Sequence, residues 1–187
     1  MNANANEVPE QNLSPAWPAE LDTRAPLPRV GDERETLTAF LDWHRATFEL
    51  KLAGIAPQRL AEKSIDPSGL SLHGLIRHLA GVERWWFALQ FAGQELPHLY
   101  YSDEEPEQDF EFTGADPAQD LAVWRAECDR SRAIVAAAPS LDALAAAPRG
   151  EEPISLRRIM VGMVAEYARH NGHADLLRER LDGSTGY

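Results

Sequence analysis

The sequence has a single cysteine, Cys128, and no long apolar run. With one cysteine no disulfide can form within the chain, so nothing in it indicates an oxidising compartment. No stretch approaches the roughly 18 consecutive apolar residues that a membrane-spanning helix needs. The N-terminus, MNANANEVPEQNL, lacks both the basic start and the apolar run of a secretory signal. We therefore expect a cytoplasmic protein.

Basic residues are also scarce, with 18 Lys and Arg against 30 Asp and Glu and a net charge of −12. Proteins that bind nucleic acids neutralise phosphates with clustered Lys and Arg, and anionic membrane surfaces attract the same residues. The charge balance therefore argues against both partners.

The 187 residues suffice for one full hydrophobic core but would make two small ones. Residues 1–31 are polar and contain five prolines, which predicts an extended arm: Pro9, Pro15, Pro18, Pro26 and Pro28. Trp17 and Leu21 are the side chains through which this arm could dock, and the sequence leaves docking open. Residues 32–183 form the predicted folded domain.

Four segments of that domain repeat apolar residues at three- and four-residue steps, the pattern of amphipathic helices. We expect helices over 32–52, 71–91, 117–138 and 155–181. Asp32, Ser68 or Ser71, Asp116 and Ser155 are the expected N-caps, and Gly54, Gly93 and Gly183 the expected stops. The predicted inward stripes include Leu37, Phe40, Leu41, His44 and Phe48 in the first helix, and Leu75, His78 or Leu79, Val82, Trp85 or Trp86, and Leu89 in the second.

These segments predict an all-α protein with a four-helix bundle, whose helix order is not fixed by the sequence. Residues 94–117 form a long connection, which is typical of a functional cover or of disorder. We expect its acidic residues to be solvated: Asp103, Glu104, Glu105, Glu107, Asp109 and Glu111.

Polar residues on the apolar stripes are the candidates for chemistry, because a buried ionisable group must be paired, neutralised or metal-bound. Glu166 and His170 are four residues apart and share one helix face, and His78 lies on another inward stripe. Two histidines and a carboxylate match the ligand set of catalytic zinc sites, which keep a fourth position open. His78 with His170 and His173 is a competing set of similar geometry. A hydrogen-bonded cluster without metal is the plainer alternative.

The remaining candidates have simpler interpretations. His44 can line the same cavity or be a core histidine. His73 is expected on a solvated face, and His98 lies in the long connection. Cys128 is expected to be a small buried side chain rather than a nucleophile. Trp85, Trp86 and Trp124 could form the wall of a pocket or plain core.

Three stretches of the chain resemble a known superfamily: GDERETLTAFLDWHRAT, PSGLSLHGLIRHLAGVERWW and EYARHNGHADLLRE. They are similar to the DinB-like superfamily, specifically its DUF664-type branch, and the resemblance covers about residues 31–183. It implies a four-helix bundle, often dimeric, with a divalent metal held by one ligand from the second helix and two from the last.

The resemblance also implies which residues hold the metal. Many members carry three His ligands, the last followed by a short Arg-Gly-Gln-like segment that His170-Asn171-Gly172-His173 resembles. This places His170 at the last ligand and Glu166 at the preceding one, where the related mycothiol-dependent isomerases also use Glu. His173 becomes a neighbour of the site. The implied set is His78, Glu166 and His170, with zinc as the expected metal and nickel as the alternative.

Characterised relatives imply a transferase or isomerase that uses a low-molecular-weight thiol such as mycothiol or bacillithiol. An open position on a divalent cation would bind the thiol sulfur and favour the thiolate. One alternative is a non-enzymatic bundle with a structural metal or a hydrogen-bonded His/Glu cluster. Another is a metal-assisted hydrolase, which needs a general base near the metal, and His44 and His173 are the candidates.

Overall fold

The computed structural model describes residues 22, 24–102, 104–105, 108–111, 114–150 and 152–186. This part of the chain folds into four long helices, with no strand and one isolated bridge between Leu144 and Ser155. The helices are α1 (Glu33–Leu52), α2 (Leu72–Glu83), α3 (Pro117–Ala137) and α4 (Leu156–Asp182), and short 3-10 turns form at η2 (Pro57–Arg59) and η4 (Gln108–Phe110). The prediction of an all-α bundle is confirmed. None of the described helices is long and apolar enough to cross a membrane.

Local capping fixes the helix ends within a residue or two of the predicted bounds. The Asp32 carboxylate accepts a hydrogen bond from the Glu35 amide, and the Glu35 side chain accepts one from the Asp32 amide, so α1 begins with a capping box. Ser71 caps α2. At the end of α4, Gly183 has φ 78°, the left-handed conformation that glycine adopts without steric cost. Each end is therefore set by residues next to it in the sequence.

The second helix departs from the single α-helix predicted over 71–91. At Arg84 it becomes a π-helix, η3 (Arg84–Phe91), in which each turn holds an extra residue. The buried positions therefore fall at Phe87 and Ala88, and Trp85 and Trp86 lie half-buried at the edge. The predicted stripe assumed α-helical spacing and was wrong beyond Glu83.

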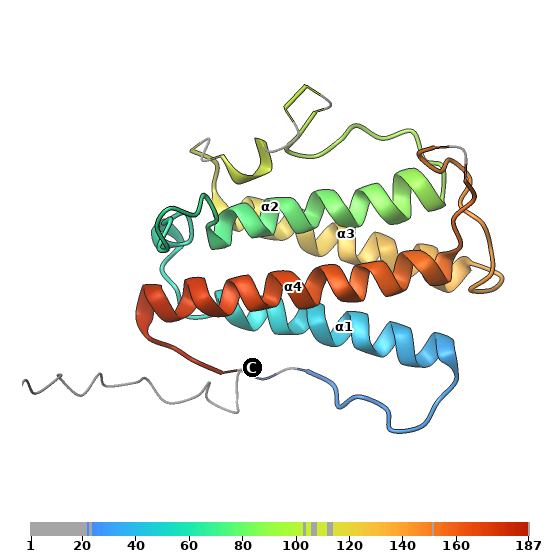
Figure 1. The fold of residues 1–187 in the computed structure, drawn as a ribbon, viewed down its shortest axis with the longest axis horizontal. Helices are drawn as coiled ribbons and strands as arrows, with labels where there is room; N and C mark the ends of the chain where they lie inside the picture. The colour runs from blue at the N-terminus through green and yellow to red at the C-terminus, as the bar shows by residue number, and fades with distance from the viewer. Residues whose placement is uncertain are drawn as a thin grey trace, which may run out of the picture.

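Figure 1 shows that α4 runs alongside α1 and that α2 runs alongside α3, and these are the two pairs of helices that pack most extensively. The largest buried side chains come from all four helices and include Phe48, Phe87, Trp124 and Tyr167. Phe40, predicted on the inward stripe of α1, is instead 37% exposed. Because α1 packs mainly on α4, only a narrow face of α1 is buried. Leu41, the next residue, lies on that face and is 1% exposed, whereas Phe40 lies outside it.

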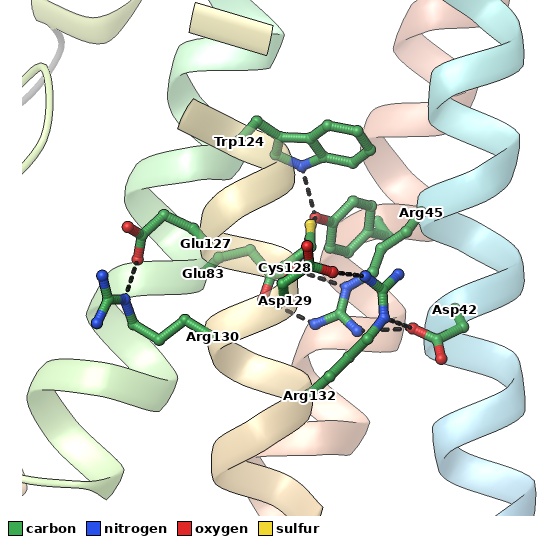
Figure 2. A network of polar contacts seen from close by, with 10 residues as sticks. Asp42, Arg45, Glu83, Trp124, Glu127, Cys128, Asp129, Arg130 and Arg132 are labelled. Atoms are coloured by element: carbon green, nitrogen blue, oxygen red, sulfur yellow. Dashed lines mark hydrogen bonds and ion pairs between the residues drawn. The ribbon is translucent and has the colours of Figure 1, made fainter. Parts of the chain in front are cut away.

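A network of buried polar groups connects the four helices (Figure 2). Arg45 of α1 donates two hydrogen bonds of 2.8 Å to the carboxylate of Glu83 in α2. The Tyr167 hydroxyl of α4 donates to the same carboxylate at 2.7 Å, and the Trp124 indole of α3 donates to that hydroxyl at 2.9 Å. Because one side chain comes from each helix, the network specifies how the helices align along the bundle axis.

Cys128 lies beside this network, 2% exposed, with its sulfur 3.7 Å from both Glu83 and the Tyr167 hydroxyl. Burial raises the pKa of its thiol well above the usual value. The burial of Cys128 confirms the expectation of a small buried side chain. Its thiol stays protonated at neutral pH, and a protonated thiol is a poor nucleophile.

The described part of the arm follows α1. The Arg24 guanidinium stacks 4.8 Å from the Trp43 ring centroid and contacts the Thr47 hydroxyl. The expected anchors Trp17 and Leu21 lie outside the described residues. Among the described residues of the arm, Arg24 is therefore the one whose contacts with α1 indicate docking.

Candidate metal centre

The bundle brings His78, Glu166 and His170 together. Glu166 and His170 lie one turn apart on α4, and His78 faces them from α2. The Glu166 Oε1 atom is 3.2 Å from His78 Nε2 and 3.1 Å from His170 Nε2. The structure thus places the three predicted ligands around one point, with one ligand atom of each within 4.8 Å of the others.

This donor set has chemistry that suits a zinc ion, and two of its donor–donor distances match zinc coordination. Donors bound to one tetrahedral zinc at about 2.0–2.1 Å lie about 3.3 Å apart, close to the two nitrogen–oxygen distances here. The site is also largely shielded from water, since the side chains of His78, Glu166 and His170 are 21%, 18% and 7% exposed. Two imidazoles and a carboxylate suit zinc, and they leave a fourth position for another ligand.

Charge within the cluster favours a bound cation. Hydrogen bonds from His170 and His78 hold the pKa of the Glu166 carboxyl well below its usual range. Burial lowers the pKa of His78, but its hydrogen bonds to Asp109 and Glu166 outweigh burial and raise the pKa to about 9. Without a metal, His78 is therefore protonated at neutral pH and acts as the local cation. A metal bound at this point would replace that proton.

Asp109 is the residue of this site that the sequence analysis missed. Its Oδ2 atom lies 2.7 Å from His78 Nδ1, and the residue is only 3% exposed. The expectation that the acidic run is solvated is therefore wrong at Asp109. The η4 turn packs on α2 and directs Asp109 inward, while Phe110 stacks on the His78 ring with centroids 4.9 Å apart. An irregular turn has no periodicity that could have indicated this burial.

His173 lies behind His170 instead of beside His78. Its Nδ1 atom is 3.3 Å from His170 Nδ1, on the side of that ring away from Glu166. Burial and the neighbouring His170 lower the pKa of His173, so its nitrogen can accept the His170 Nδ1–H. Among the described residues, the group with metal-binding spacing contains His78, Glu166 and His170 without His173.

The other candidate histidines lie apart from this cluster. His44 contacts the Asn171 side chain, with 3.3 Å between His44 Nδ1 and Asn171 Nδ2. His73, expected on a solvated face, is 3% exposed and lies 2.7 Å from Asp120 Oδ2. That prediction was wrong because α3 covers the start of α2. His98 stacks on Trp85, with ring centroids 5.4 Å apart.

A cavity of about 760 Å³ opens beside His78. Trp85 and Trp86 line it, as one interpretation of the sequence proposed, whereas Trp124 belongs to the buried core. Asp109, Phe110 and Tyr101 line the side formed by the long connection, and Arg149 and Arg158 lie on its other side. The described part of that connection is therefore a cover. A small molecule in this cavity would touch a ligand of the candidate metal.

Comparison with known proteins adds one family. A family model described as mycothiol-S-transferase matches residues 36–183. The match spans the four helices and includes His78, Asp109, Glu166 and His170. No curated protein matches the chain.

Proposed function

Because this chain belongs to the mycothiol-S-transferase family, within the DinB-like superfamily, we propose that it is a metal-dependent transferase using a low-molecular-weight thiol. Mycothiol is the first candidate for that thiol. The observation that carries the proposal is the cluster of His78, Glu166 and His170, of which His78 lines a cavity of about 760 Å³. Zinc is the proposed metal and nickel the alternative. We also assign the chain to the DUF664-type branch of the superfamily.

Each residue of the centre has a distinct part in this proposal. His78 and His170 present Nε2 and Glu166 presents Oε1 to the metal. Asp109 and His173 contact the opposite ring nitrogens, so with a metal bound both imidazoles would carry their N–H at Nδ1 and leave the Nε2 lone pair for the metal. When bound, the divalent cation favours the thiolate over the thiol at neutral pH. The cavity walls would hold the thiol and its electrophile together, which lowers the entropic cost of their reaction.

The overall transfer balances without any redox partner. With a chlorinated aromatic as the electrophile, a carbon–sulfur bond forms and the carbon–chlorine bond breaks. The thiol proton and the chloride leave as acid. No protein nucleophile is required, which agrees with the buried and protonated state of Cys128.

Two alternatives have less support from the geometry. The hydrogen-bonding distances of 3.1 Å and 3.2 Å favour a metal-free cluster. Such a cluster, however, does not explain the cavity that His78 lines. Metal-assisted hydrolysis needs a general base. His44 is engaged with Asn171, and His173 stands behind His170.

Cobalt-substituted protein tests the proposal. A low-molecular-weight thiol should produce a sulfur-to-cobalt charge-transfer band, and His78→Ala should abolish it. Thiol consumption with a chlorinated aromatic should then depend on the metal. An unchanged cobalt spectrum in the presence of thiol would refute thiol binding at the centre.

The control variant is Cys128→Ser. The Cys128 sulfur lies in the Glu83–Tyr167 network, so this change should leave both the band and the metal content intact. A cobalt spectrum altered by Cys128→Ser and unaffected by thiol would instead identify a structural site closed by the protein's own sulfur.

A further inference from the structure

We propose that Asp109 is a positioning residue that strengthens metal binding through His78 and couples the metal to the docking of residues 99–102 and 108–111. This inference rests on the proposed function, because it takes His78 as a ligand. Asp109 belongs to neither ligand-bearing helix. It lies in the η4 turn of the connection between α2 and α3.

The two proposed histidine ligands are held in different ways. Behind His78 stands a carboxylate at 2.7 Å, and behind His170 stands an imidazole at 3.3 Å. A carboxylate acceptor makes the imidazole a stronger donor to a metal than a neutral acceptor does. The charge of Asp109 therefore acts on the metal through one ring, and His78 should be the ligand more sensitive to its partner.

Among the described residues, His78 is the charged partner of the buried Asp109 carboxylate. The residue is 3% exposed, and its other oxygen, Oδ1, is buried and has no hydrogen-bond partner in the described part of the chain. Its one ion pair among those residues is with His78. A buried carboxylate is costly unless a positive charge compensates it. Arg169 pairs with Glu166 at 2.6 Å, whereas Asp109, among the residues described, has its compensating positive charge only through His78, so a cation bound at His78 would stabilise the Asp109 carboxylate.

The segment that carries Asp109 is fastened at several points. The Tyr100 hydroxyl donates to Asp120 Oδ1 at 2.7 Å, the Arg77 guanidinium stacks on the Tyr100 ring at 4.8 Å, and Phe110 stacks on His78. Any contact that improves metal affinity when the segment is docked must equally favour docking when the metal is bound. Metal binding should therefore make residues 99–102 and 108–111 more rigid.

Zinc affinity of the whole chain, measured by competition with a chromophoric chelator, tests the role of Asp109. Asp109→Asn keeps the shape and an acceptor oxygen but removes the charge, and we expect zinc to bind about 10–100-fold more weakly. The cobalt ligand-field spectrum should shift in the same variant, which a loss of stability alone would not cause.

Asp120→Asn is the matched control. Asp120 is also a buried carboxylate 2.7 Å from a histidine of α2, but that histidine, His73, lies outside the metal cluster. The zinc affinity of this variant should fall much less than that of Asp109→Asn, because Asp120 acts only on the docking of the segment through Tyr100. Equal weakening in the two variants would overturn the positioning role of Asp109, because the effect would then come from the docking of the segment and not from the charge behind His78.

Hydrogen exchange of the wild-type protein provides a second measurement that needs no variant to fold. Zinc should slow amide exchange in residues 99–102 and 108–111, and unchanged exchange on zinc binding would refute the coupling. The two proposals fail in different ways. A wild type that binds no zinc contradicts the metal centre, whereas tight zinc binding by Asp109→Asn contradicts the positioning role alone.

Discussion

The loss of stability caused by breaking the buried Arg45–Glu83 ion pair can be estimated directly from the structure. Glu83 is 0% exposed and Arg45 is 3% exposed, and two hydrogen bonds of 2.8 Å join them. Arg45→Met would leave the Glu83 charge buried, with the Tyr167 hydroxyl as its remaining close donor. Removing one partner of a buried pair in this way typically costs about 3–5 kcal/mol. We expect the free energy of unfolding to fall by about that amount.

The double variant Arg45→Met with Glu83→Gln separates charge from packing. It removes the uncompensated charge and keeps an amide oxygen that can accept from Tyr167, so most of the lost stability should return. Urea unfolding is the assay, and the exposed Arg125–Glu49 pair provides the control. Arg125→Met should change stability by less than about 1 kcal/mol, because water screens that pair. An equally small effect of Arg45→Met, or a double variant no more stable than the single one, would refute the reasoning.

Four further predictions concern the metal centre and the arm. Zinc affinity should rise with pH up to about 9, because the metal must displace the proton of His78, and zinc titrations at several pH values check this. The same raised pKa means that, in the metal-free protein, His78 contributes stability below its ordinary pKa of 6.5 and loses that contribution as pH rises through about 9, which urea unfolding across this range measures. His173→Ala should leave zinc occupancy nearly intact, and loss of zinc would favour the set of His78, His170 and His173. A chain that begins at Gly31 should fold and lose at most about 1 kcal/mol, since the Arg24–Trp43 stacking is the main arm contact described, and a large fall in melting temperature would contradict this.

The parts of this structure that sequence could predict are those that local spacing determines. The caps at Asp32, Ser71 and Ser155 define where three helices begin. The four-residue step from Glu166 to His170 places both side chains on one face of α4. His78 could be proposed as their partner because the apolar pattern of its own helix indicated that it faces the bundle core.

The features that sequence could not predict depend on contacts between distant segments. The π-helix at Arg84 shifts the buried face, and no residue pattern marks where it begins. The Arg45–Glu83 pair joins residues 38 positions apart, and each alone has the sequence pattern of a surface charge. Asp109 resembles its solvated acidic neighbours until the turn that carries it packs on α2.

The most direct test of the account is the metal content of protein purified without added metal or a nickel column. The wild type should contain about one divalent metal per chain, and His78→Ala and His170→Ala should each lose most of it. His98→Ala is the matched control, since His98 stacks on Trp85 and Tyr101 outside the cluster, and it should retain the metal. Full metal occupancy in both His78→Ala and His170→Ala would contradict the metal centre proposed for this fold.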